Sequence, residues 1–113
     1  MRHMLSALVF VGVAASAAAV NGQTPAQVEK GVTVYAAQKC SICHSVAGKG
    51  NPKGVLDGVG AKLSAEEIRQ WLTNAPEMAA KAKAARKPAM KAFPNLAKDD
   101  VDALVAYLHS LKK

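Results

Sequence analysis

The residues with the clearest chemical potential are two cysteines and a histidine within residues 40–44, Cys-Ser-Ile-Cys-His. Cys40, Cys43 and His44 form the C-x-x-C-H pattern by which c-type haem is attached. In this arrangement the two thiols add to the two vinyl groups on one edge of a porphyrin. The adjacent imidazole is then placed under the ring, where one of its nitrogens can bind iron. The motif therefore predicts one covalently bound, iron-containing haem c, with His44 as an iron ligand.

Other uses of a C-x-x-C pair fit this chain less well. A thioredoxin-like dithiol belongs to a βαβ pattern, and no segment here alternates as a strand would. A zinc site needs four ligands as a rule. Cys40, Cys43 and His44 supply three, and His109 lies at the far end of another expected helix. A disulfide between the two cysteines would close a tiny loop and stabilise little. Haem attachment remains the favoured interpretation of the motif.

A second iron ligand would come from the opposite face of the ring, and a methionine thioether there favours the ferrous state. Beyond the first twenty residues the chain offers Met78 and Met90. Met78 falls in an expected helix, where methionine mostly fills gaps in a core. Met90 stands in an extended stretch between Pro88 and Pro94, where no helical pattern explains it. The sequence favours Met90 as the ligand and leaves Met78 as the alternative.

The N-terminal residues have the layout of a secretory leader: a short basic start, an apolar run and an alanine-rich tail. We expect residues 1–22 to be a signal peptide, cleaved between about positions 19 and 22, and residues 23–113 to be the functional domain. The alternative is an uncleaved membrane anchor, since the apolar run is only just long enough to cross a bilayer. The leader predicts a periplasmic protein, exported to the compartment in which haem is attached.

The charge balance narrows the class of partner. The chain has 15 Lys and Arg against 8 Asp and Glu, a net charge of +7. A basic exported protein of this size meets acidic proteins or anionic lipid, and export argues against nucleic acid. Few aromatic residues follow the leader, so a domain of this length is short of core, and a non-protein group is expected at its centre.

The remaining pattern is helical. Helices are expected at residues 25–39, 64–74, 77–86 and 98–111, with a glycine-rich loop over residues 45–60. Thr24 followed by Pro25 reads as a helix start, and Ser64 followed by Glu67 reads as a capping box. The predicted fold class is all-α.

With these features in place, the chain resembles the class I c-type cytochromes. Gly31 and Tyr35 resemble the glycine and aromatic residue of the family's first helix, and residues 104–108 resemble its last-helix signature. Residues 54–63 are similar to its loop after the haem motif. Met90 with residues 93–96 is similar to its methionine-ligand segment.

The resemblance implies a cytochrome c-like fold in which the first and last helices cross at Gly31 and wrap around one haem. It also implies a monomeric electron carrier that is not an enzyme, with His44 and Met90 as axial ligands. A tryptophan such as Trp71 donates to a haem propionate in similar proteins, and plain core packing is the alternative. The family often has proline where this chain has Val55. We still expect a carbonyl of this loop to accept the histidine's second N–H, because orienting the ring needs an acceptor and not a proline.

The expected partners are redox proteins with acidic docking surfaces. Contact with a membrane is expected only through partner complexes or an uncleaved leader. A basic cluster near Met90 would form the docking surface, although a solvated helix face is the simpler account. The cluster consists of Lys81, Lys83, Arg86, Lys87 and Lys91. The rival function is a five-coordinate haem that binds a small ligand or turns over peroxide, with no methionine on iron.

Overall fold

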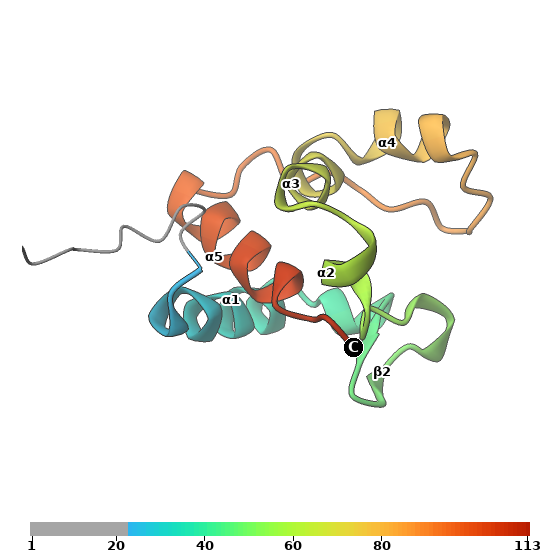
Figure 1. Ribbon diagram of the computed structural model, residues 1–113. Helices are drawn as coiled ribbons and strands as arrows, with labels where there is room; N and C mark the ends of the chain where they lie inside the picture. Colours follow the sequence, from blue (N-terminus) through green and yellow to red (C-terminus); the bar gives the residue numbers. More distant parts are fainter. Residues whose placement is uncertain (1–22) are drawn as a thin grey trace, which may run out of the picture.

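Two helices from opposite ends of the sequence cross in the computed structural model, which describes residues 23–113 (Figure 1). In chain order the elements are α1 (Pro25–Ala37), η1 (Cys40–Ile42), β1 (Ser45–Val46), β2 (Lys49–Gly50), η2 (Pro52–Gly54), α2 (Val59–Lys62), α3 (Ala65–Thr73), α4 (Ala75–Ala82) and α5 (Lys98–His109), where η denotes a short 3₁₀ helix. The predicted all-α class is confirmed. The expected leader, residues 1–22, lies outside the described residues. Within residues 23–113 no helix is long and apolar enough to span a bilayer.

The start of α1 follows from local side-chain chemistry. The hydroxyl of Thr24 accepts from the backbone N–H of Gln27 at 3.2 Å, and the side chain of Gln27 accepts from the N–H of Thr24 at 3.4 Å. This reciprocal pair satisfies two donors that the first turn leaves free. The helix ends at Ala37, two residues before the predicted end, and Lys39 adopts a left-handed conformation with φ 57°. The chain thereby turns into η1 and the cysteine motif.

The crossing of α1 and α5 takes place at Gly31, as the resemblance implied. A Cβ at this position would lie 2.2 Å from the carbonyl oxygen of Ala103 and 2.5 Å from Cβ of Tyr107. One turn further along α1, Tyr35 stacks on Tyr107 with ring centroids 5.6 Å apart and planes 4° from parallel. The close approach therefore requires a residue without a side chain at position 31.

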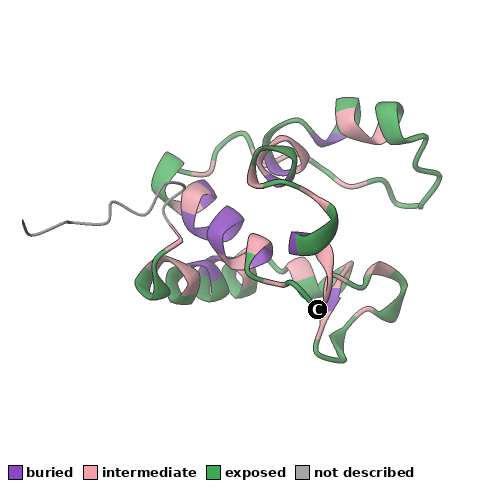
Figure 2. Ribbon diagram, in the orientation of Figure 1, coloured by how far each residue is buried: buried purple, intermediate pink, exposed green. Residues whose placement is uncertain are grey.

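The core lies between α5, α3 and α1, and Figure 2 shows the buried residues gathered on these helices. The buried apolar cluster consists of Val34, Ile68, Leu72, Val101, Leu104, Val105 and Leu108. By contrast, α4 and the segment that follows it are largely exposed. Only Ala75, at the start of α4, is fully buried there. The core thus fixes α1, α3 and α5, while α4 lies outside it.

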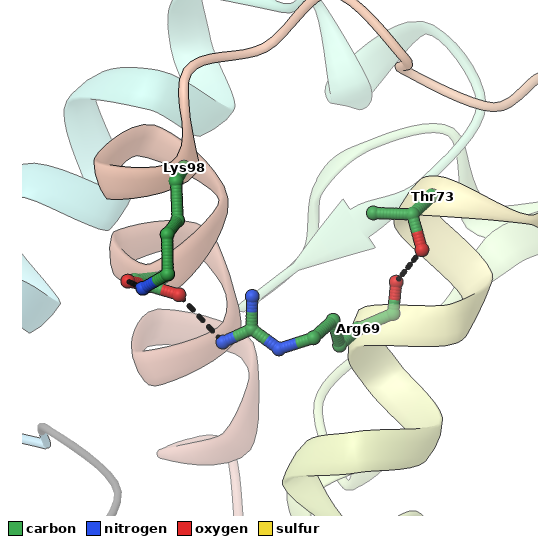
Figure 3. A network of polar contacts seen from close by, with 4 residues as sticks. Arg69, Thr73 and Lys98 are labelled. Carbon is green, nitrogen blue, oxygen red and sulfur yellow. Dashed lines mark hydrogen bonds and ion pairs between the residues drawn. The ribbon is translucent and has the colours of Figure 1, made fainter.

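An ion-pair network ties α3 to α5 beside this core (Figure 3). The carboxylate of Asp102 accepts from the guanidinium of Arg69 at 2.6 Å and from the ammonium of Lys98 at 2.7 Å. The hydrogen bond from Lys98, followed by that from Arg69, holds the pKa of Asp102 below its ordinary value. The hydroxyl of Thr73 donates to the carbonyl of Arg69 at 3.0 Å, within α3. Asp102 thus joins the first turns of α5 to the middle of α3.

The segment expected to be irregular, residues 45–60, contains short regular elements. Strands β1 and β2 pair antiparallel, with Ser45 opposite Gly50 and Val46 opposite Lys49. The turn between them places Ala47 and Gly48 at positive φ, 51° and 77°. Two-residue strands are too short to show alternation, which explains why the sequence pattern missed them. The four-residue helix α2 was also missed, because a single turn is too short to show helical periodicity.

The other helix limits differ from the prediction by a few residues. The helix predicted at residues 77–86 begins earlier, at Ala75, and ends at Ala82, where Lys83 takes a left-handed conformation with φ 51°. The last helix ends at His109, before the predicted position 111. Its N-terminus has no side-chain cap, because Ala97 stands at the capping position and has no polar side chain.

Candidate haem site

The two cysteines and the histidine lie on one tight turn that follows α1. Cys40 opens η1, and its carbonyl accepts from the backbone N–H groups of both Cys43 and His44, at 3.1 and 2.9 Å. Both cysteines are free thiols and half-buried. Burial raises the pKa of the Cys40 thiol. The structure therefore holds the three residues of the motif together without a disulfide.

The imidazole of His44 is oriented by a backbone carbonyl of the following loop. Its Nδ1 lies 3.0 Å from the carbonyl oxygen of Gly54. Because a carbonyl oxygen only accepts, Nδ1 carries the proton and donates it. Burial, with a contribution from the nearby Arg86 guanidinium, lowers the pKa of His44, so the ring is neutral at neutral pH. The lone pair of Nε2 is then available for a metal.

The loop that supplies this carbonyl is fastened to the cysteine motif through Asn51. The backbone N–H of Asn51 donates to the carbonyls of Ser41 and His44, at 3.1 and 3.0 Å. Its side-chain amide donates to the carbonyl of Ile42 at 3.1 Å. Asn51 lies three positions before Gly54, so these bonds hold the loop against the motif. The expectation that a loop carbonyl would orient the histidine, even without the family's proline at Val55, is confirmed.

Position 54 has no room for a side chain. A Cβ here would lie 2.2 Å from the carbonyl oxygen of Cys43, 2.8 Å from Nδ1 of His44 and 2.2 Å from Nη1 of Arg86. Any larger residue would push the loop away from the histidine. The contact with Arg86 was not foreseen, because the sequence places that residue more than thirty positions away, in the basic cluster.

A cavity of about 720 Å³ opens between the loop after the motif and the helices α2, α3 and α4. Its walls include Val55, Val59, Leu63, Trp71 and Met78, together with the charged or polar Lys62, Glu67, Gln70 and Lys81. Val55 is 62% exposed, although it is a large apolar residue. The cavity has the size of a large ligand site and an apolar wall that such a ligand would cover.

The two methionines occupy different places. Met78 lines the cavity beside Trp71 and is absent from the core cluster of the described residues, so its interpretation as core filler is wrong. Met90 is half-buried and packs against the core, in a segment without regular structure. That segment is anchored three residues later, where the N–H of Phe93 donates to the carbonyl of Leu72 at 2.8 Å. Met90 does not belong to the cavity wall as the described residues form it.

These residues fit a covalently bound haem. The thiols of Cys40 and Cys43 are free and adjacent, and His44 keeps Nε2 available while its Nδ1 is satisfied. The neighbouring cavity offers apolar side chains for a porphyrin and cations for its carboxylates.

The phenol of Tyr35 is buried without a hydrogen-bond partner among residues 23–113, and burial raises its pKa to about 12, so it stays neutral.

Comparison with known proteins agrees with this geometry. The family model described as Cytochrome c matches residues 28–112, from α1 to the chain's C-terminal end. No curated protein and no solved structure matches the chain. The matched region contains the cysteine motif, the loop of Gly54, Trp71 and both methionines, and members of this family bind haem c through C-x-x-C-H. The chain therefore belongs to the cytochrome c family, as a small class I c-type cytochrome.

Proposed function

We propose that this cytochrome is an exported, mono-haem electron carrier that works in the periplasm. The family performs haem-based electron transfer. Bound haem supplies a one-electron couple, Fe(II)/Fe(III). The observation that carries the proposal is the His44–Gly54 hydrogen bond beside two free thiols, because it leaves Nε2 available to bind the iron of a haem that Cys40 and Cys43 would hold. The leader-like layout of residues 1–22 in the sequence supports export.

The protein's own part in this function is to hold, orient and enclose the group. Cys40 and Cys43 would hold it by thioether bonds, and His44 would bind one face of the iron. On the cavity wall, the indole N–H of Trp71 would donate to a propionate. Lys62 and Lys81, on the same wall, would offset the propionate charge. None of these roles needs a catalytic acid or base, so we propose a carrier and not an enzyme.

We propose Met90 as the ligand on the opposite face. It lies in an irregular segment, which can present a thioether more freely than a helix can. Met78, on α4, is the competitor, because it already lines the cavity. Coordination by methionine favours the ferrous state and raises the reduction potential.

The test compares Met90→Ala with Met78→Ala in the haem-loaded protein. Met90→Ala should abolish the weak methionine-to-iron band at the red edge of the ferric visible spectrum and lower the potential. Met78→Ala should leave both nearly unchanged. The reverse pattern would transfer the ligand role to Met78. A wild-type protein without the band that binds carbon monoxide rapidly would instead favour the five-coordinate rival.

We further propose a monomer that docks acidic redox proteins through the basic cluster of residues 81–91. All five cations of the cluster are exposed. Two of them already have local partners: Lys81 pairs with Glu77 at 3.7 Å, and Lys91 lies over the ring of Phe93 at 5.6 Å. Lys83 and Lys87 form no ion pair within residues 23–113 and would attract an acidic partner most directly.

A further inference from the structure

One member of the basic cluster, Arg86, does not behave as a simple surface charge. It lies in the irregular segment between α4 and Met90, yet its guanidinium reaches the loop that follows the cysteine motif. A Cβ built on Gly54 would lie 2.2 Å from Nη1 of Arg86 and 2.8 Å from Nδ1 of His44. The guanidinium and the imidazole therefore meet at the same glycine.

This glycine is the residue whose carbonyl accepts the hydrogen bond from His44, at 3.0 Å. No carboxylate of residues 23–113 forms an ion pair with Arg86. The positive charge beside the imidazole therefore has no neutralising carboxylate among these residues.

A fixed positive charge near a redox centre opposes the removal of an electron, because oxidation adds one more positive charge to the centre. We propose that Arg86 is a positioning residue that raises the reduction potential of the haem, by holding its guanidinium against Gly54 beside the axial imidazole of His44. The inference rests on the proposed function, since it takes His44 as the axial ligand. It is separate from docking, because the potential is a property of the isolated protein.

The neighbouring cation provides a matched control. Lys87 carries the same charge and is also exposed, but it is not among the residues that supply the three atoms nearest to a Cβ at Gly54, which are Cys43, His44 and Arg86. Arg86→Gln and Lys87→Gln therefore remove one charge each at adjacent positions. Only the first removes the charge that lies beside the histidine. Arg86→Lys keeps a charge on a shorter, unforked side chain.

The experiment is a redox titration of the haem-loaded full chain, with no partner present and at low ionic strength. Arg86→Gln should lower the ratio of ferrous to ferric protein at a fixed electrode potential by about three- to tenfold, tenfold corresponding to 59 mV for one electron. Lys87→Gln should change the ratio by less than about twofold. Arg86→Lys should recover most of the wild-type ratio.

The ferric methionine band is recorded for each variant, so that a change of ligand is recognised. An unchanged potential in Arg86→Gln, with the band intact, would overturn the role of Arg86 and leave the proposed carrier function standing. Equal shifts in Arg86→Gln and Lys87→Gln would overturn it as well, because net charge alone would then explain the potential. Loss of the band in Arg86→Gln would mean that Arg86 acts by holding the methionine segment, which contradicts an effect through His44.

Discussion

The crossing of α1 and α5 at Gly31 provides a sharp test of the fold. Gly31→Ala introduces a Cβ that would lie 2.2 Å from the carbonyl oxygen and 2.9 Å from the carbonyl carbon of Ala103, and 2.5 Å from Cβ of Tyr107. These are backbone atoms and a side-chain root, so no rotamer change can relieve the contact. The two helices must move apart, and the core side chains between them, such as Val34 and Leu104, lose contact.

Two opposing terms set the magnitude. Replacing glycine by alanine inside a helix favours the helix by about 1 kcal/mol. Overpacking costs about 1–3 kcal/mol, and the upper end applies here because backbone atoms are involved. The net loss in free energy of unfolding is therefore about 2 kcal/mol. For a domain of this size, about 4–8 °C per kcal/mol gives a Tm lower by about 8–16 °C.

Thermal unfolding of the haem-loaded protein, followed by circular dichroism, measures this loss. Val32→Ala is the control, since Val32 is the next residue of the same helix and is 48% exposed. It should change the free energy of unfolding by less than about 0.5 kcal/mol. A Tm for Gly31→Ala equal to or above that of the wild type would refute the close crossing.

Two further outcomes are expected. Asp102→Asn should destabilise the protein by about 1 kcal/mol at pH 7 in urea titrations, because Asp102 accepts charge-assisted hydrogen bonds from Lys98 and Arg69. The pKa of this carboxyl is lowered on folding, so the difference in free energy of unfolding between Asp102→Asn and wild type should shrink as the pH falls from about 4 through the folded-state pKa. A difference that persists in acid would contradict the network. Lys87→Glu should slow association with an acidic redox protein about threefold or more at low salt, measured by stopped-flow spectroscopy. Lys113→Glu makes the same change of charge at the chain end, and an equal effect there would show that overall charge alone attracts the partner.

Much of the helical framework could be read from the sequence, because the signals are local. The capping pairs begun by Thr24 and Ser64 involve residues three positions apart, and the structure contains both. The apolar stripe of the last helix repeats at helical spacing, and it forms most of the core. The spacing of Cys40, Cys43 and His44 is likewise set within five residues. Each of these features depends on bonds or spacings within one or two turns of chain.

The tertiary structure alone decided which distant groups surround the histidine. The sequence indicated that a loop carbonyl would orient His44. Only the folded loop, which Asn51 holds by hydrogen bonds, shows that this is the carbonyl of Gly54. Likewise, Met78 reached the cavity wall and Arg86 reached Gly54 although both lie far along the chain. Contacts of this kind leave no periodic pattern, because they depend on how separate segments are placed by core packing. The physical reason is that hydrogen-bond and capping preferences act along the chain, whereas packing and electrostatics act through space.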